Sequence, residues 1–154
     1  MIRILALVRH GLAAGQAPNA ELLPEGAAYL RRLGAKLNGE GWKPAVVLTS
    51  PYLRARASAA ILAQTLGVSA APIVLDELVP EAEPFDALEA ITAAAPLETP
   101  ALVVAHLPLL GRLAHDLVGE DPTFSPGTLV EIAYEGEGHA RLLRRIGPRD
   151  LGGE

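Results

Sequence analysis

Histidine, arginine and hydroxyl side chains follow three aliphatic segments of the sequence, at the points where those segments end. The three groups are Arg9-His10-Gly11, Thr49-Ser50-Pro51-Tyr52-Leu53-Arg54 and His106-Leu107-Pro108. Each aliphatic segment has the length and composition of a buried strand. Ligands of parallel α/β sheets bind outside the carboxyl ends of the strands. The spacing therefore predicts that two imidazoles and two guanidiniums emerge at one edge of a sheet.

These residue types suit the binding and attack of a phosphoryl group. Arginine pairs with phosphate through two parallel hydrogen bonds, and helix N-termini attract anions. Ser50 is predicted to be the N-cap and Pro51 the first residue of the next helix, so Arg54 lies within reach of the sheet edge. Gly11 allows the backbone after His10 to approach a ligand closely.

Strands and helices alternate along the chain. Strands are predicted at 2–8, 45–48, 73–75 and 101–105, helices at 24–37, 52–66, 85–95 and 107–118, and a hairpin at 128–134 and 140–146. This order favours a three-layer α/β/α sandwich with a mostly parallel central sheet and an antiparallel C-terminal hairpin. The 154 residues are expected to form one domain, 1–154. Residues 147–154 are predicted to be frayed.

The composition argues against several classes of function. The chain has 13 Lys and Arg against 18 Asp and Glu, a net charge of −5, which disfavours a nucleic-acid binder or an anionic-membrane binder. It has no cysteine, so histidine is the nucleophile to look for. No apolar segment approaches the length of a membrane span and no leader pattern is visible, so a cytoplasmic location is expected.

Three motifs resemble those of the histidine phosphatase superfamily, which has the phosphoglycerate-mutase-like fold. They are Leu7-Val8-Arg9-His10-Gly11, Thr49-Ser50-Pro51-Tyr52-Leu53-Arg54-Ala55 and Val104-Ala105-His106-Leu107-Pro108-Leu109-Leu110-Gly111. Most branches carry His-Gly at the third motif. The His-Leu-Pro found here is similar to the SixA branch, the small phosphohistidine phosphatases, and the short chain also suits that branch.

The resemblance implies that His10 is the nucleophile and is transiently phosphorylated. Arg9, Arg54 and His106 would form the phosphate pocket. Gly11 and Ser50 are two further candidate phosphate-binding residues. Attack requires a neutral imidazole, which flanking arginines favour. His106 would serve as a cation or as a hydrogen-bond donor, and water would then hydrolyse the phosphorylated histidine. No cofactor or metal is implied, and the sequence has no metal-ligand spacing of carboxylates and histidine.

The sequence departs from the family pattern in two places. Ala20 and Leu23 occupy positions where related proteins often carry arginine and threonine, so one phosphate contact is expected to be missing. The segment after the third strand offers Glu77 as a candidate for the general acid, and its alternative interpretation is a solvated loop carboxylate. A phosphohistidine substrate, whose leaving group is an imidazole, has less need of a strong acid.

The expected function is therefore hydrolysis of phosphohistidine on a protein, such as a histidine phosphotransfer domain, through a phosphorylated His10. Phosphate or sulfate is expected to bind in the pocket. Two alternatives stay open at this point. One is a phosphomonoesterase for small metabolites or sugar phosphates, and the other is a non-catalytic phosphate-binding module.

Overall fold

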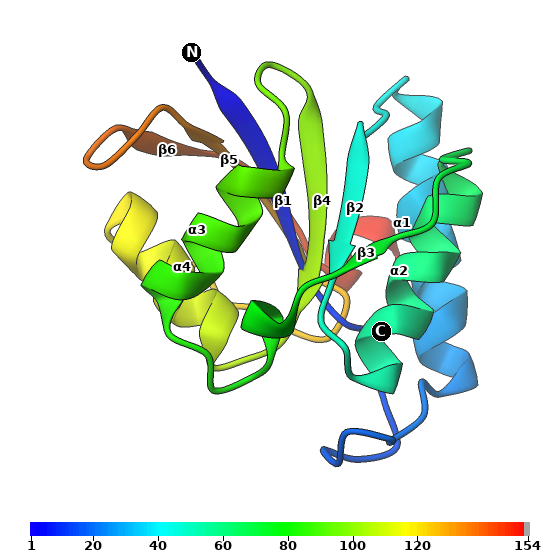
Figure 1. Ribbon diagram of the computed structural model, residues 1–154. Coiled ribbons are helices and arrows are strands. Elements are labelled where there is room, and N and C mark those ends of the chain that lie inside the picture. The colour runs from blue at the N-terminus through cyan, green and yellow to red at the C-terminus, as the bar shows by residue number, and fades with distance from the viewer. Residues whose placement is uncertain (153–154) are drawn as a thin grey trace.

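A computed structural model describes residues 1–152 and contains a six-stranded sheet at its centre (Figure 1). The strand order is β3-β2-β4-β1-β5-β6. The strands are β1 (Arg3–Arg9), β2 (Val46–Thr49), β3 (Ile73–Val74), β4 (Pro100–Ala105), β5 (Leu129–Tyr134) and β6 (Ala140–Ile146). The helices are α1 (Pro24–Gly39), α2 (Leu53–Thr65), α3 (Pro84–Ala94) and α4 (Leu109–Val118), with short 3-10 turns η1 (Asp76–Leu78) and η2 (Pro148–Leu151).

The first four strands run parallel, and the last two form the antiparallel edge. β1 pairs with β4 in parallel and with β5 antiparallel, β2 pairs in parallel with both β3 and β4, and β5 and β6 form the hairpin. The predicted fold class is therefore confirmed. Arg9 lies opposite Ala105, and Thr49 opposite Val104. The segments that follow β1, β2 and β4 consequently leave the sheet at the same edge.

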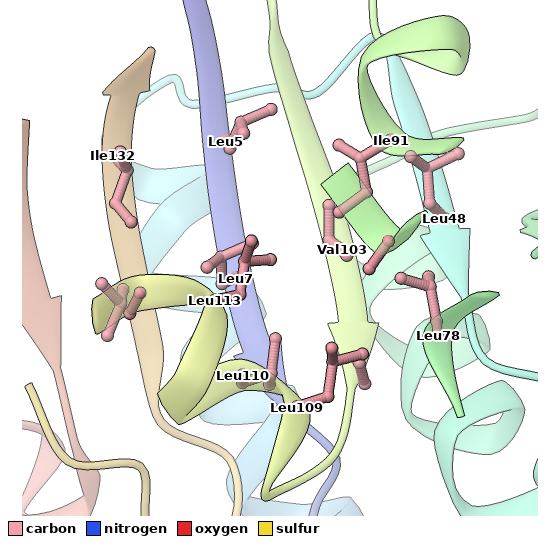
Figure 2. Packing of buried hydrophobic residues seen from close by; sticks show 14 of the residues in the cluster. Leu5, Leu7, Leu48, Leu78, Ile91, Val103, Leu109, Leu110, Leu113 and Ile132 are labelled. Atoms are coloured by element: carbon pink, nitrogen blue, oxygen red, sulfur yellow. The ribbon is translucent and has the colours of Figure 1, made fainter. Parts of the chain in front are cut away.

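Helices cover both faces of the sheet, with α1 and α2 on one side and α3 and α4 on the other (Figure 1). Successive side chains of a strand point to opposite faces. Leu5 and Leu7 of β1 accordingly pack in the cluster under α3 and α4, and Figure 2 shows Leu7 beside Leu110 and Leu113 of α4. Ala6 and Val8 belong to the other cluster, under α1 and α2. Burial on both faces explains why β1 and β4 are almost continuously apolar in sequence.

Two local expectations were wrong. α2 begins at Leu53 rather than at Tyr52, and its N-cap residue is Tyr52 rather than Ser50. The hydroxyl of Ser50 instead accepts the backbone N–H of Tyr52 at 3.1 Å, a local turn that competes with a helical start. The C-terminal segment is also not frayed over residues 147–151, because η2 packs against α1 and Leu151 contacts the core. The remaining part of the segment predicted to be frayed, residues 153–154, lies outside the described residues.

None of the helices within residues 1–152 combines the length and the apolar composition required to cross a membrane.

Candidate active site at the carboxyl edge of the sheet

Two histidines and one arginine meet at the carboxyl edge of β1, β2 and β4. The ring centroids of His10 and His106 are 5.0 Å apart, and Arg54 lies against His10 from the first turn of α2. All three side chains are buried, with exposed fractions of 7%, 1% and 4% for His10, His106 and Arg54. The structure thus brings together side chains that are 44 to 96 positions apart in sequence, as the strand-end pattern predicted.

The imidazole of His10 is held as a single tautomer. Its Nδ1 lies 2.7 Å from the carbonyl oxygen of Gly11. A carbonyl oxygen accepts hydrogen bonds and cannot donate them, so Nδ1 carries the proton. Nε2 therefore carries the lone pair, and it accepts a hydrogen bond from Nε–H of Arg54 at 3.1 Å. The nitrogen that faces the guanidinium is the one able to act as a nucleophile.

Arg54 also ties the loop after β1 to the site. Its Nη1 donates to the carbonyl oxygen of Ala17 at 2.8 Å, and the N–H of Leu53 donates to the carbonyl oxygen of Pro18 at 2.9 Å. The loop thus contacts the start of α2 and holds a second nitrogen of the guanidinium. Two anchored nitrogens hold this arginine in place before any ligand binds.

Arg9 approaches the site from the end of β1. Its Nη1 donates to the carbonyl oxygen of Phe124 at 3.0 Å, while its Nε is buried without a hydrogen-bond partner among the described residues. Burial and the nearby charge of Arg54 both lower the pKa of Arg9. Two guanidiniums close enough to oppose each other's charge form a place where an anion is favoured.

Ser50 holds the second histidine. Its hydroxyl lies 2.7 Å from Nε2 of His106, and the residue has no exposed surface. The same hydroxyl accepts the N–H of Tyr52, whose ring packs edge-on against His106 at 5.0 Å between centroids. The Nδ1 of His106 is buried and has no partner among residues 1–152. Ser50 thus contacts His106 directly, in addition to the phosphate-binding role predicted for it.

Both imidazoles are neutral near pH 7. Burial lowers the pKa of His10 to about 4, with smaller lowering effects from Arg54 and Arg9 and an opposing effect from the Gly11 carbonyl. The prediction that arginines keep His10 neutral has the right sign, but burial is the larger cause. Burial, then His10 and the two arginines, lower the pKa of His106 to about 3. His106 was expected to act as a cation or as a hydrogen-bond donor, and a neutral ring can act only as the donor.

Gly11 is closely packed and contacts Ser58, a residue that the sequence pattern did not indicate. Its N–H donates to the hydroxyl of Ser58 at 3.0 Å, and that hydroxyl donates to the carbonyl oxygen of Arg54 at 2.7 Å. A Cβ at Gly11 would lie 3.0 Å from both Leu22 and Leu30. Ser58 therefore joins the backbone after His10 to the helix that carries Arg54. Its position one helical turn after Arg54 is the feature of the sequence that could have indicated it.

The remaining candidates lie farther out. Glu77 is exposed on η1, and its role stays a prediction. Ala20 is half-buried in the loop, where its N–H donates to the carbonyl oxygen of Ala17. Leu23 is the N-cap residue of α1 and contributes no side-chain hydrogen bond. Within residues 1–152, no three histidine or acidic side chains are grouped as metal ligands.

Comparison with known proteins links this geometry to one family. The family model described as "Histidine phosphatase superfamily (branch 1)" matches residues 5–84. The chain is 29% identical over 152 residues to the phosphohistidine phosphatase SixA of Escherichia coli, covering 94% of each protein. It is also similar to a solved structure of the protein histidine phosphatase SixA with tungstate, at a TM-score of 0.85 and 25% identity, covering 96% of this chain and 99% of that one.

The fold is shared more widely. A phosphoglycerate mutase from Plasmodium falciparum matches with a TM-score of 0.71 and 18% identity, over 94% of this chain and 90% of that one. At this identity the likeness concerns the fold alone, and it agrees with the predicted phosphoglycerate-mutase-like architecture.

Proposed function

Because this chain belongs to the histidine phosphatase superfamily, branch 1, we propose that it hydrolyses phosphohistidine on a protein substrate through a phosphorylated His10. The observation that carries the proposal is the state of His10 itself. The Gly11 carbonyl fixes the proton on Nδ1, and the lone pair of Nε2 faces Arg54. A neutral, oriented imidazole beside two guanidiniums is the arrangement that phosphoryl transfer to histidine requires.

In the first step, Nε2 of His10 attacks the phosphorus of the substrate's phosphohistidine. The new N–P bond forms as the substrate's N–P bond breaks, and the departing imidazole takes up one proton. Arg9, Arg54 and a neutral His106 donate hydrogen bonds to the phosphoryl oxygens, whose charge is spread over three atoms in the transition state. Nδ1 of His106, which lacks a partner among the described residues, supplies such a donor when Ser50 donates its hydroxyl proton to Nε2.

In the second step, water attacks the phosphorus of phosphorylated His10. The N–P bond breaks, inorganic phosphate leaves, and His10 returns to its neutral tautomer. No step draws on a metal ion. Glu77 remains the candidate donor of the leaving-group proton in the first step.

Support for a phosphohistidine substrate comes from the relatives. The E. coli protein of that name matches along nearly its whole length, and the tungstate complex shows that a SixA protein binds an oxyanion of phosphate-like shape. A histidine phosphotransfer domain is the substrate class we propose, and the cytoplasmic location stays a prediction.

The experiment compares phosphate release from a phosphohistidine protein with release from a panel of phosphomonoesters. We expect the phosphohistidine protein to be the better substrate and H10A to abolish its turnover. His139 is exposed in the β5–β6 turn, so H139A is the matched control and should keep the wild-type rate. Faster turnover of a sugar phosphate would favour the phosphomonoesterase. Full activity of H10A would overturn the mechanism, and failure to trap a phosphorylated enzyme with any donor would favour a non-catalytic module.

A further inference from the structure

A pocket of about 970 Å³ opens beside the candidate active site, and the mechanism above does not use it. Its walls are the first half of α1, the segment Ser125–Pro126, and residues 145 and 147–150 near the C-terminus. Gly127, the next residue along the second wall, donates its N–H to the carbonyl oxygens of Arg9 at 2.9 Å and His10 at 3.0 Å. The pocket therefore shares a wall with the backbone that carries the nucleophile.

The pocket is rich in arginine, although the chain as a whole has a net charge of −5. Arg32, Arg145 and Arg149 line it, and all three are exposed. Two carboxylates, those of Glu25 and Asp150, line it as well, so the guanidiniums exceed the carboxylates by one; an oxygen of Asp150 also accepts a backbone N–H at 2.7 Å. A local surplus of guanidiniums on an acidic protein attracts anionic partners to this face and repels basic ones.

A buried hydroxyl lies among these arginines. Tyr29 of α1 lines the pocket and is only 7% exposed, and its hydroxyl has no hydrogen-bond partner among residues 1–152. Burial, and secondly the charge of Asp150, raise the pKa of Tyr29 to about 12, so the hydroxyl keeps its proton and is available as a donor. Arg32 sits over the Tyr29 ring, 5.7 Å from its centroid. A buried donor without an acceptor is costly, and a ligand with an acceptor oxygen relieves that cost.

We infer that this pocket binds an acidic segment of the protein that carries the phosphohistidine. A carboxylate of that segment pairs with the arginines, as planar guanidiniums favour, and accepts the O–H of Tyr29. Docking there places the partner's phosphorylated side chain at the neighbouring sheet edge, across the shared wall. The inference rests on the proposed function, because it assigns a docking surface to the same reaction.

The test uses two substrates of the same chemistry and different size. One is a histidine phosphotransfer domain phosphorylated on its histidine, and the other is phosphoimidazole, which is too small to reach the pocket. The readout is the ratio of their kcat/KM values. R32E/R149E reverses two charges in the pocket, and R31E/K43E reverses two exposed charges outside it, Arg31 being the neighbour of Arg32 on α1.

We expect the ratio to fall about tenfold or more in R32E/R149E and to keep its wild-type value in R31E/K43E. The wild-type ratio should also fall as salt is raised, since exposed charges are screened. Y29F should lower the ratio while leaving the protein at least as stable, because it removes an unpaired buried group.

An equal fall in both double variants, or an unchanged ratio in R32E/R149E, would overturn the docking assignment while leaving the phosphatase function in place. A wild-type protein that releases phosphate from neither substrate would instead overturn the proposed function, and the docking assignment with it.

Discussion

Nε of Arg54 donates a hydrogen bond to Nε2 of His10 at 3.1 Å, so the guanidinium occupies the direction from which phosphorus must approach the nucleophile. Two roles follow for one side chain. Before the reaction it keeps the lone pair of Nε2 oriented, and on substrate binding it transfers its hydrogen bond to a phosphoryl oxygen. Its second anchor, the carbonyl oxygen of Ala17, allows this transfer without releasing the whole side chain.

Substitution of Arg54 tests this double role. R54A should lower kcat/KM for a phosphohistidine protein by about 100-fold, the usual loss when one preorganised donor is removed. R54K should recover little of this loss, because an ammonium lacks the planar pair of donors. Steady-state kinetics and the affinity for tungstate measure both effects. Arg56, exposed on the same helix, provides the control R56A, and a fully active R54K would contradict the geometry.

Ser50 is expected to act by holding His106. S50A removes the hydroxyl that lies 2.7 Å from Nε2 of His106. We expect kcat to fall about tenfold, which is the loss seen when a metal-binding histidine loses the hydrogen-bond partner that orients its ring. S50T, which keeps a hydroxyl, should recover part of the rate. The NMR signals of the His106 ring nitrogens should change in S50A and not in S69A, which alters an exposed serine. Unchanged ring signals in S50A would show that the contact does not control the tautomer.

The two buried imidazoles should make stability depend on pH. In the unfolded chain histidine titrates near 6.5, whereas the folded pKa values are about 4 for His10 and about 3 for His106. Between these limits the unfolded state binds more protons, so the free energy of unfolding falls as pH falls from about 6.5 toward 4. The loss is on the order of 3 kcal/mol for each histidine.

Urea unfolding at pH 7.5 and at pH 4.5 measures this dependence. H106N should show a smaller loss than the wild type, while H115N, at an exposed position of α4, should behave as the wild type. Because His10 is neutral, its protonation should cause no change of kcat/KM with pH above about pH 5. A kcat/KM that falls with an apparent pKa near 6.5 would contradict this and would indicate that the nucleophile is solvated.

Alanine substitutions at two glycines of α1 distinguish the effect of close packing near the site from the effect of helix propensity on stability. A Cβ at Gly26 would lie 2.5 Å from the carbonyl oxygen of Leu12, two residues after His10, whereas a Cβ at Gly39 would meet nothing within 4 Å. G26A should therefore destabilise the protein by about 2 kcal/mol and displace the loop after β1. G39A should stabilise it by about 0.5 kcal/mol. Thermal unfolding measures both, and equal effects would show that the loop adapts freely.

Much of this arrangement could be predicted because it depends on local pattern. Apolar runs flanked by glycine and proline gave the strand and helix order, and reading the residues after each strand located His10, Arg54 and His106. The carboxyl ends of parallel strands lie at the same edge of a sheet, so these side chains come together irrespective of the loop conformations.

Other features depend on contacts between distant residues, which no local pattern encodes. The hydroxyl of Ser50 meets a ring 56 positions away, and Ser58 meets the amide of Gly11 across 47 positions. The N-cap prediction for Ser50 failed because capping preference cannot show which of two nearby amides the hydroxyl accepts. η2 was missed because Gly147 and Asp150 gave no apolar periodicity, although their hydrogen bond orders that segment.

The hydrogen bond from Nδ1 of His10 to the Gly11 carbonyl has a chemical consequence for the covalent intermediate. A free imidazole can be phosphorylated on either nitrogen, giving two regioisomers. Here one nitrogen is blocked by its own proton and by a carbonyl that belongs to the next residue. The intermediate should accordingly form as the tele isomer alone, and a ³¹P spectrum of the trapped protein should contain one phosphoramidate resonance.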